Sequence, residues 1–160
     1  MKVVSNTSPI CYLYLINHIE ILPNLFGDIY IPEAVYNELQ DRSAPLELQR
    51  WIRQPPSWLN INEVNISSDS NLFRLHAGER DAIYLAKEIA ADLILLDEKA
   101  ARNIALEKGL RVAGLVGVLD KAATKKMINL KEAVEKLIRT NFRISPQILS
   151  NLLNKHYGNK

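Results

Sequence analysis

The sequence has little of what several protein classes require. Cys11 is the only cysteine in 160 residues, which excludes an internal disulfide and gives no sign of a thiolate metal site. No apolar run approaches the roughly 20 residues of a membrane helix. The opening MKVVSNTSPI lacks a signal-peptide pattern, because Ser5, Asn6 and Thr7 interrupt its short apolar run. We therefore expect a cytoplasmic protein with no membrane contact and an inert, buried Cys11 thiol.

The composition is that of an ordinary globular protein. Hydrophobic residues make up 48% and charged residues 24% of the chain, so neither disorder nor a fibrous repeat is indicated. A length of 160 residues fits one domain. We expect residues 1–160 to form a single domain, with residues 130–160 as its C-terminal helices.

Charge is distributed unevenly along the chain. Residues 1–98 hold 7 basic and 14 acidic residues, whereas residues 99–160 hold 13 basic and 4 acidic ones. Carboxylates bordered by a basic surface suit a metal-dependent enzyme that acts on a polyanion, although the asymmetry taken alone is explained better by solvated helix faces that merely differ in charge. The candidates for contact with nucleic acid are Lys121, Lys125, Lys126, Arg139 and Arg143.

Short apolar runs alternate with amphipathic segments, which indicates a parallel sheet covered on both faces. We predict a three-layer α/β/α sandwich with a central, mainly parallel sheet of four to five strands. The predicted strands are Lys2–Ser5, Asp28–Ile31, Trp58–Ile61 near a sheet edge, Leu93–Leu96 and Arg111–Ala113. The predicted helices include Ile10–Ile16 after a Ser8 cap, Ile19–Phe26, one opened by Pro32, Ala44–Arg53, one after Gly78, Glu98–Lys108, Gly114–Asp120, Leu130–Arg139 and Pro146–His156, and residues 65–71 are read as a loop.

The segment GERDAIYLAKEIAADLILLDEKAAR, from Gly78 to Arg102, contains two candidate functional carboxylates. Glu79 lies on the apolar stripe of the predicted helix, and Asp97 follows an apolar strand at its carboxyl end. In an open parallel sheet that end is where ligands bind. We therefore expect the two acids to meet in one pocket, although Asp97 is also well placed to cap the following helix.

Two further residues stand at equivalent places. Asn6 ends the first predicted strand, where its side chain either binds a ligand or caps the turn. Glu38 lies beside Leu39 at the edge of an apolar stripe, where most glutamates simply face solvent. Carboxylate oxygens are hard ligands for Mg²⁺ or Mn²⁺, and a pair of such ions can activate water against a phosphodiester. Together these residues predict a metal-dependent hydrolytic site.

The segments VVSNTSPI, IPEAVYNEL and GERDAIYLAKEIAADLILLDEKAAR resemble PIN-domain proteins, in particular the branch related to VapC-like toxins. The resemblance runs from Val3 to about Arg143 and includes the spacing of eighteen positions between Glu79 and Asp97. It implies an α/β/α sandwich, Mg²⁺ or Mn²⁺ as cofactor, cleavage of single-stranded RNA, dimerisation and inhibition by a cognate antitoxin. It also implies catalytic roles for Glu38, Glu79 and Asp97, and a metal site formed by these acids with Asn6.

Asn6 departs from the family pattern, which has an aspartate at this place. An amide oxygen can bind a hard cation but brings no charge, so we expect weaker metal binding. Glu98, or Thr7 or Ser8, could compensate, whereas Asp81 points elsewhere on its helix and suits a salt bridge. The sequence thus leaves three hypotheses: a toxin-type endoribonuclease, a catalytically impaired PIN fold that binds RNA or protein, and a receiver-like or small-molecule-binding domain that uses Asp97 alone.

Overall fold

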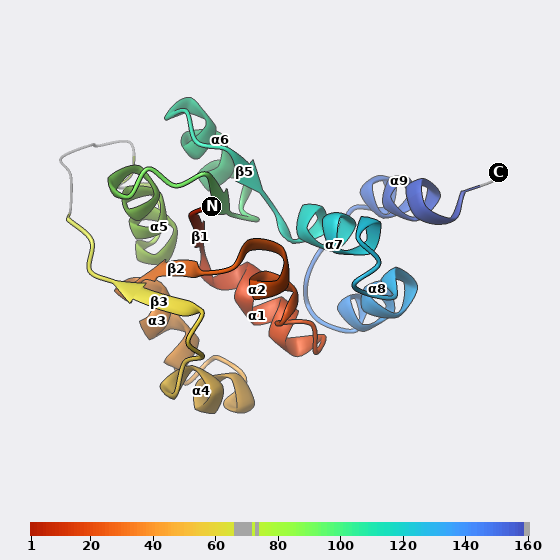
Figure 1. Ribbon diagram of the computed structural model, residues 1–160, viewed down its shortest axis with the longest axis horizontal. Coiled ribbons are helices and arrows are strands. Elements are labelled where there is room, and N and C mark those ends of the chain that lie inside the picture. Colours follow the sequence, from red (N-terminus) through yellow and green to blue (C-terminus); the bar gives the residue numbers. More distant parts are fainter. Residues whose placement is uncertain (66–71, 73, 159–160) are drawn as a thin grey trace.

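The chain is described from a computed structural model, in which residues 1–65, 72 and 74–158 are placed. Figure 1 shows a central sheet with helices on both of its faces. The described strands form one sheet in the order β3-β2-β1-β4-β5, and every pair is parallel. The strands are β1 (Val3–Ser5), β2 (Ile29–Pro32), β3 (Leu59–Asn62), β4 (Leu93–Leu95) and β5 (Val112–Ala113).

The predicted α/β/α sandwich is confirmed. The helices connecting and following these strands are α1 (Thr7–Leu15), α2 (Ile21–Phe26), α3 (Glu33–Gln40), α4 (Leu46–Arg53), α5 (Ala77–Glu88), α6 (Lys99–Glu107), α7 (Leu115–Thr124), α8 (Leu130–Ile138) and α9 (Pro146–Tyr157). As predicted, β3 lies at an edge of the sheet. The predicted loop at residues 65–71 lies, from residue 66 onward, outside the described residues.

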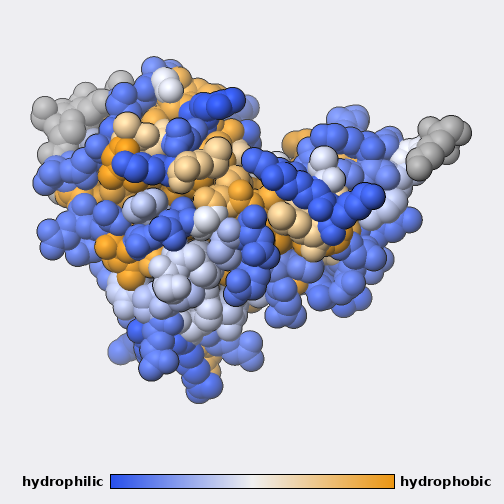
Figure 2. Space-filling model, in the orientation of Figure 1, coloured by the Kyte–Doolittle hydropathy of each residue, from blue (hydrophilic) through white to orange (hydrophobic). Residues whose placement is uncertain are grey.

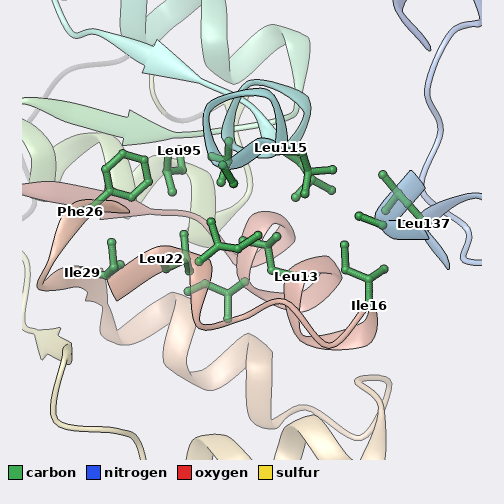
Figure 3. Close-up of a cluster of buried hydrophobic side chains, with 14 of the residues drawn as sticks. Leu13, Ile16, Leu22, Phe26, Ile29, Leu95, Leu115 and Leu137 are labelled. Carbon is green, nitrogen blue, oxygen red and sulfur yellow. The ribbon is translucent and has the colours of Figure 1, made fainter. Parts of the chain in front are cut away.

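Alternate residues of β1 and β4 enter two separate cores, which is why these two strands are apolar without alternation. Val3 and Leu95 pack into the larger core, whereas Val4, Ile94 and Leu96 face the smaller core, which includes residues of α5 and α6. Figure 3 shows part of the larger core, where β-strand residues meet side chains from α1, α2, α7 and α8. The sheet is therefore covered on both faces by apolar side chains.

The C-terminal helices pack into the larger core with the rest of the chain. Leu130 and Leu137 of α8 and Leu152 of α9 are buried in the same cluster as Leu13 of α1 and Ile16, which directly follows α1. In Figure 1 these helices lie together with α7 at one end of the molecule. This packing brings the segment that joins α8 to α9 next to α1.

The register places the ends of β1 and β4 side by side. Ser5 pairs with Leu95, and the Asn6 backbone N–H donates to the Leu95 carbonyl at 3.0 Å. Strand β1 has β2 on one side and β4 on the other, and the chain crosses from one side to the other at this point. Open α/β sheets bind ligands at the carboxyl ends of strands beside such a switch.

The predicted Ser8 cap is wrong, and the alternative that Asp97 caps the following helix is not what the structure shows. The N-cap of α1 is Asn6, not Ser8, and the N-cap of α6 is Glu98, not Asp97. Neither cap residue makes a side-chain capping bond. Ser8 and Asp97 instead contact each other, as described below, because short polar side chains can exchange a local partner for a tertiary one.

The face in Figure 2 carries hydrophilic residues around its periphery, with apolar residues visible between them. No helix among the described residues is both long enough and apolar enough to cross a membrane.

Candidate functional site

A pocket of about 920 Å³ opens at the carboxyl ends of β1, β4 and β5. All four residues singled out by the sequence line it: Asn6, Glu38, Glu79 and Asp97. Two of them follow strands, and the other two come from α3 and α5. The expectation that these oxygens share one cavity therefore agrees with their positions, while their chemical roles stay predictions.

Asn6 contributes a buried oxygen without a partner. The residue is 4% exposed, and its Oδ1 accepts no hydrogen bond within the described part of the chain. The capping alternative for this side chain is not what the structure shows, because it caps no helix. Leaving a buried acceptor unpaired costs about 1–3 kcal/mol, so an oxygen of this kind in a pocket wall indicates a ligand.

Glu38 reaches the pocket across the beginning of α5. Its Oε1 accepts a hydrogen bond from the Thr7 hydroxyl at 2.8 Å, and its carboxylate lies against the Cα of Gly78. A methyl group at position 78 would collide with that carboxylate. Negative charge is favourable at a helix N-terminus, and glycine leaves the space for the Glu38 carboxylate to approach it.

Glu79 is buried at the third position of α5. It accepts a hydrogen bond from the backbone N–H of His76, the N-cap residue, in the manner of a capping box. Burial raises the pKa of Glu79, His76 lowers it in part, and the neighbouring charges of Glu98 and Glu38 raise it further. A cation placed here would relieve both the burial cost and the repulsion.

Asp97 lies at the N-terminus of α7. Its Oδ1 accepts the backbone N–H of Leu115 at 2.7 Å, and its Oδ2 faces the Ser8 hydroxyl at 3.3 Å. A Cβ at position 114 would lie 2.8 Å from Oδ1, so Gly114 leaves room for this carboxylate. Burial raises the pKa of Asp97, and the contacts with Leu115, Ser8 and the charge of Arg102 lower it only partly.

The residues that could compensate for the absent first aspartate of the family pattern differ in whether they line the pocket. Thr7, Ser8 and Glu98 line the pocket. Asp81 is in an ion pair with Arg80 at 3.0 Å, as the sequence predicted. Glu98 is thus the additional carboxylate that the pocket offers.

Basic residues contribute to one side of the pocket. Arg143, a predicted phosphate contact, lines it, and so does Arg102 of α6. Neither arginine is in an ion pair within the described part of the chain. Arg139 does not line the pocket, and Lys121 lies over the Phe26 ring, 5.2 Å from its centre.

The donor set suits a hard divalent cation, because it consists of carboxylates and an unpaired amide oxygen. Among residues 1–65, 72 and 74–158, however, no three side chains of His, Cys, Asp or Glu are grouped so that they could hold a metal ion. Closing around a cation therefore requires side-chain movement. Glu38 has the freedom for it, since 34% of its side chain is exposed.

Some pocket residues were not among those predicted from the sequence. His76 is one of them: its Nε2 lies 3.4 Å from Glu79 Oε1 and its Nδ1 lies 3.9 Å from Glu38 Oε2. Its place three residues before Glu79 was the available signal. Phe142 gave no signal, because its position depends on packing against α1. Cys11 also lines the pocket; it is half-buried rather than buried, and burial raises the pKa of its thiol.

Comparison with known proteins gives a matching family profile and a similar solved structure. A protein-family profile described as a PIN domain matches residues 2–157. A solved structure of a PilT N-terminus domain protein from the hyperthermophilic archaeon Sulfolobus solfataricus P2 aligns with a TM-score of 0.48 and 15% sequence identity, covering 91% of this chain and 100% of that chain. The search of curated proteins gives no match.

Proposed function

Because the chain belongs to the PIN-domain family, whose members are generally nucleases, we propose that it is a metal-dependent endoribonuclease that cleaves single-stranded RNA. The observation that supports this most strongly is the convergence of Asn6, Glu38, Glu79 and Asp97 on one pocket from four separate segments. A receiver-like domain that uses Asp97 alone leaves the other two carboxylates unexplained.

Asn6, Glu38, Glu79 and Asp97 would hold the metal, for which we propose Mg²⁺ or Mn²⁺. The bound cation would supply Lewis-acid chemistry for phosphodiester hydrolysis. The protein's own part is to keep the four oxygens in one place. The N-termini of α5 and α7 favour negative charge at Glu38 and Asp97, and burial of Glu79 strengthens its attraction to a cation.

The test is cleavage of an end-labelled single-stranded RNA by purified protein in the presence of Mn²⁺. Glu79→Gln and Asp97→Asn keep the shape of each side chain and remove its charge. We expect each to lower the cleavage rate by more than the roughly 100-fold that loss of an outer-shell partner can cost a metal site. Asp81→Asn is the matched control, because Asp81 is a near neighbour of Glu79 that pairs with Arg80.

Cleavage that persists unchanged in both Glu79→Gln and Asp97→Asn would eliminate the mechanism. A uniform loss in all three variants, including Asp81→Asn, would point to a folding defect. Circular dichroism melting of each variant separates a folding defect from a catalytic effect.

A catalytically impaired PIN fold that binds RNA or protein is the second candidate, and Asn6 is the observation that favours it. An amide oxygen supplies less attraction for a cation than a carboxylate does. Asn6→Asp should then raise the affinity for Mn²⁺ measured by calorimetry. Each 1.4 kcal/mol of added binding free energy corresponds to about a tenfold gain in affinity. Tight Mn²⁺ binding by the wild-type chain would count against impairment.

We also propose that the chain is the toxin of a type II toxin–antitoxin pair, that a cognate antitoxin protein inhibits it, and that it forms a homodimer. These three points rest on the sequence resemblance to VapC-like toxins. Co-purification with the product of an adjacent reading frame and size-exclusion chromatography with light scattering test them.

A further inference from the structure

Apolar residues line the pocket as well as acidic ones. They include Tyr12 of α1, Val116 of α7, Ile148 of α9 and Phe142. Ile148 is 50% exposed, although it lies beside other apolar side chains. A cavity that combines carboxylates with an aromatic and aliphatic wall suits a ligand that has both a charged part and a flat apolar part.

Phe142 belongs to a segment, residues 139–145, that side-chain contacts hold against α1. The Tyr12 hydroxyl donates to Asn141 Oδ1 at 2.6 Å, and the rings of Tyr12 and Phe142 meet edge to face with centres 5.0 Å apart. The Thr140 hydroxyl oxygen accepts the Phe142 backbone N–H at 3.2 Å and donates to the Leu137 carbonyl at 2.6 Å. The segment thus presents its side chains from a fixed backbone.

Arg143, the next residue, is a cation that lines the pocket. Its side chain is exposed, and it makes no ion pair within residues 1–65, 72 and 74–158. Arg102 lies on the same pocket, near Asp97. Guanidinium groups beside an acidic pocket attract phosphate. Because they do not pair with the carboxylates, the carboxylates are free to bind a cation.

We propose that Tyr12, Phe142 and Arg143 form a subsite for one unpaired nucleotide next to the acidic pocket. The base lies against the aromatic wall, and a flanking phosphate lies beside the Arg143 guanidinium. This inference rests on the proposed ribonuclease function and adds to it which residues hold the RNA. Stacking on aromatic rings tolerates any base, so the subsite selects single strands rather than a sequence.

The test is binding of a fluorescein-labelled single-stranded RNA decamer to the full chain in EDTA, followed by anisotropy. We expect Phe142→Leu and Arg143→Ala each to weaken binding by about five- to tenfold. Arg143→Ala should also reduce the slope of log affinity against log salt by about 0.7, the value for one phosphate contact on a single strand. Phe142→Leu should leave that slope unchanged.

Two controls separate recognition from folding. Arg139→Ala removes a cation four residues from Arg143 that does not line the pocket, so it should bind RNA like the wild type. Phe142→Tyr keeps a ring that can stack and should restore the binding that Phe142→Leu loses. Loss of binding in Arg139→Ala equal to that in Arg143→Ala would overturn the assignment of the phosphate contact.

The outcomes distinguish this subsite from the function on which it rests. If the wild type cleaves RNA with Mn²⁺ but Phe142→Leu and Arg143→Ala bind RNA as it does, the subsite is wrong and the ribonuclease stands. If the wild type neither binds nor cleaves single-stranded RNA, both are wrong. If it binds without cleaving and the two variants weaken binding, the subsite is supported and the chain is an RNA-binding module.

Discussion

Glu79 and Asp97 are placed where their charge is costly to the folded chain without a cation. Both carboxyl groups have raised pKa values, and burial is the main cause for each. A raised folded-state pKa means that the folded chain binds the proton more tightly than the unfolded chain does. Stability then increases as pH falls through the window between the two pKa values, and it decreases as pH rises through that window.

Asp97→Asn and Glu79→Gln should therefore melt at higher temperature than the wild type near pH 7 in EDTA. Each 1 kcal/mol of relieved burial cost is worth about 2–4 °C for a chain of this size. The advantage should shrink as pH falls toward the ordinary values of 3.8 for Asp and 4.5 for Glu. Thermal melts monitored by circular dichroism between pH 4 and pH 8 measure it, and a difference independent of pH would contradict this explanation.

Substitution of Gly78 should lower RNA cleavage without lowering the stability of the fold. In α5 an alanine is a better helix former than glycine by about 0.5–1 kcal/mol, and the three atoms nearest to the new methyl group all belong to the Glu38 carboxylate, which can move. Gly78→Ala should thus fold at least as stably as the wild type, while RNA cleavage falls because Glu38 is displaced.

Urea denaturation and an RNA-cleavage assay on the same preparation check this. Unchanged cleavage in Gly78→Ala would show that the position of Glu38 does not matter.

For individual residues, the sequence could predict which side-chain oxygens lie at the pocket, but not which groups those oxygens contact. Asn6 and Asp97 were predictable, because the end of a parallel strand fixes where its last side chain lies. The exchange of a capping role for the Ser8–Asp97 contact was not, since those residues are 89 positions apart. His76 was missed for the same reason: its contact with Glu38 depends on how α3 packs beside α5.

Helix α9 is held to α7 by a cluster of charged groups. Asp120 of α7 accepts from Lys155 Nζ at 2.9 Å and lies 2.7 Å from His156 Nε2. Burial raises the pKa of Asp120, but the hydrogen bonds and charges of Lys155 and His156 outweigh it and hold the pKa below its ordinary value. The stabilisation is therefore present above pH 3.8 and is lost as pH falls through the lower, folded-state pKa.

Asp120→Asn should loosen α9 without unfolding the sheet. Partly exposed ion pairs contribute about 0–1 kcal/mol each, so amide exchange in residues 147–157 should accelerate up to roughly tenfold. Hydrogen–deuterium exchange with mass spectrometry measures this by segment. Glu132→Gln breaks a pair within α8 alone, with Lys136 at 3.2 Å, and should leave α9 unchanged.

The predicted elements largely match the observed ones, because each carries its own periodicity and its own end signal. Helix α9 begins at Pro146 as predicted, where the Ser145 hydroxyl oxygen accepts the Ile148 backbone N–H at 3.1 Å. Helix α1 begins earlier than predicted, at Thr7. The 139–145 segment has no periodicity, and its tertiary contact with Tyr12 helps to fix its position.

In the whole molecule, the acidic first part and the basic later part of the chain both contribute charged side chains to the pocket. Its carboxylates all come from residues up to Glu98, whereas its arginines, Arg102 and Arg143, come from the later part of the chain. The strand order β3-β2-β1-β4-β5 produces this arrangement, because it places the first and fourth strands side by side. The sequence could predict the sheet and both charge groups, but not that Arg143 would reach the pocket and Arg139 would not.

The central claim is that oxygens from four segments hold a divalent cation in one pocket. Titration of the metal-free chain with Mn²⁺, followed by electron paramagnetic resonance of the free ion, tests it most directly. If the pocket is a metal site, the wild type and Asp81→Asn should bind Mn²⁺ saturably, and Glu79→Gln should lose this binding. Equal binding by all three proteins, or no binding by the wild type, would contradict it.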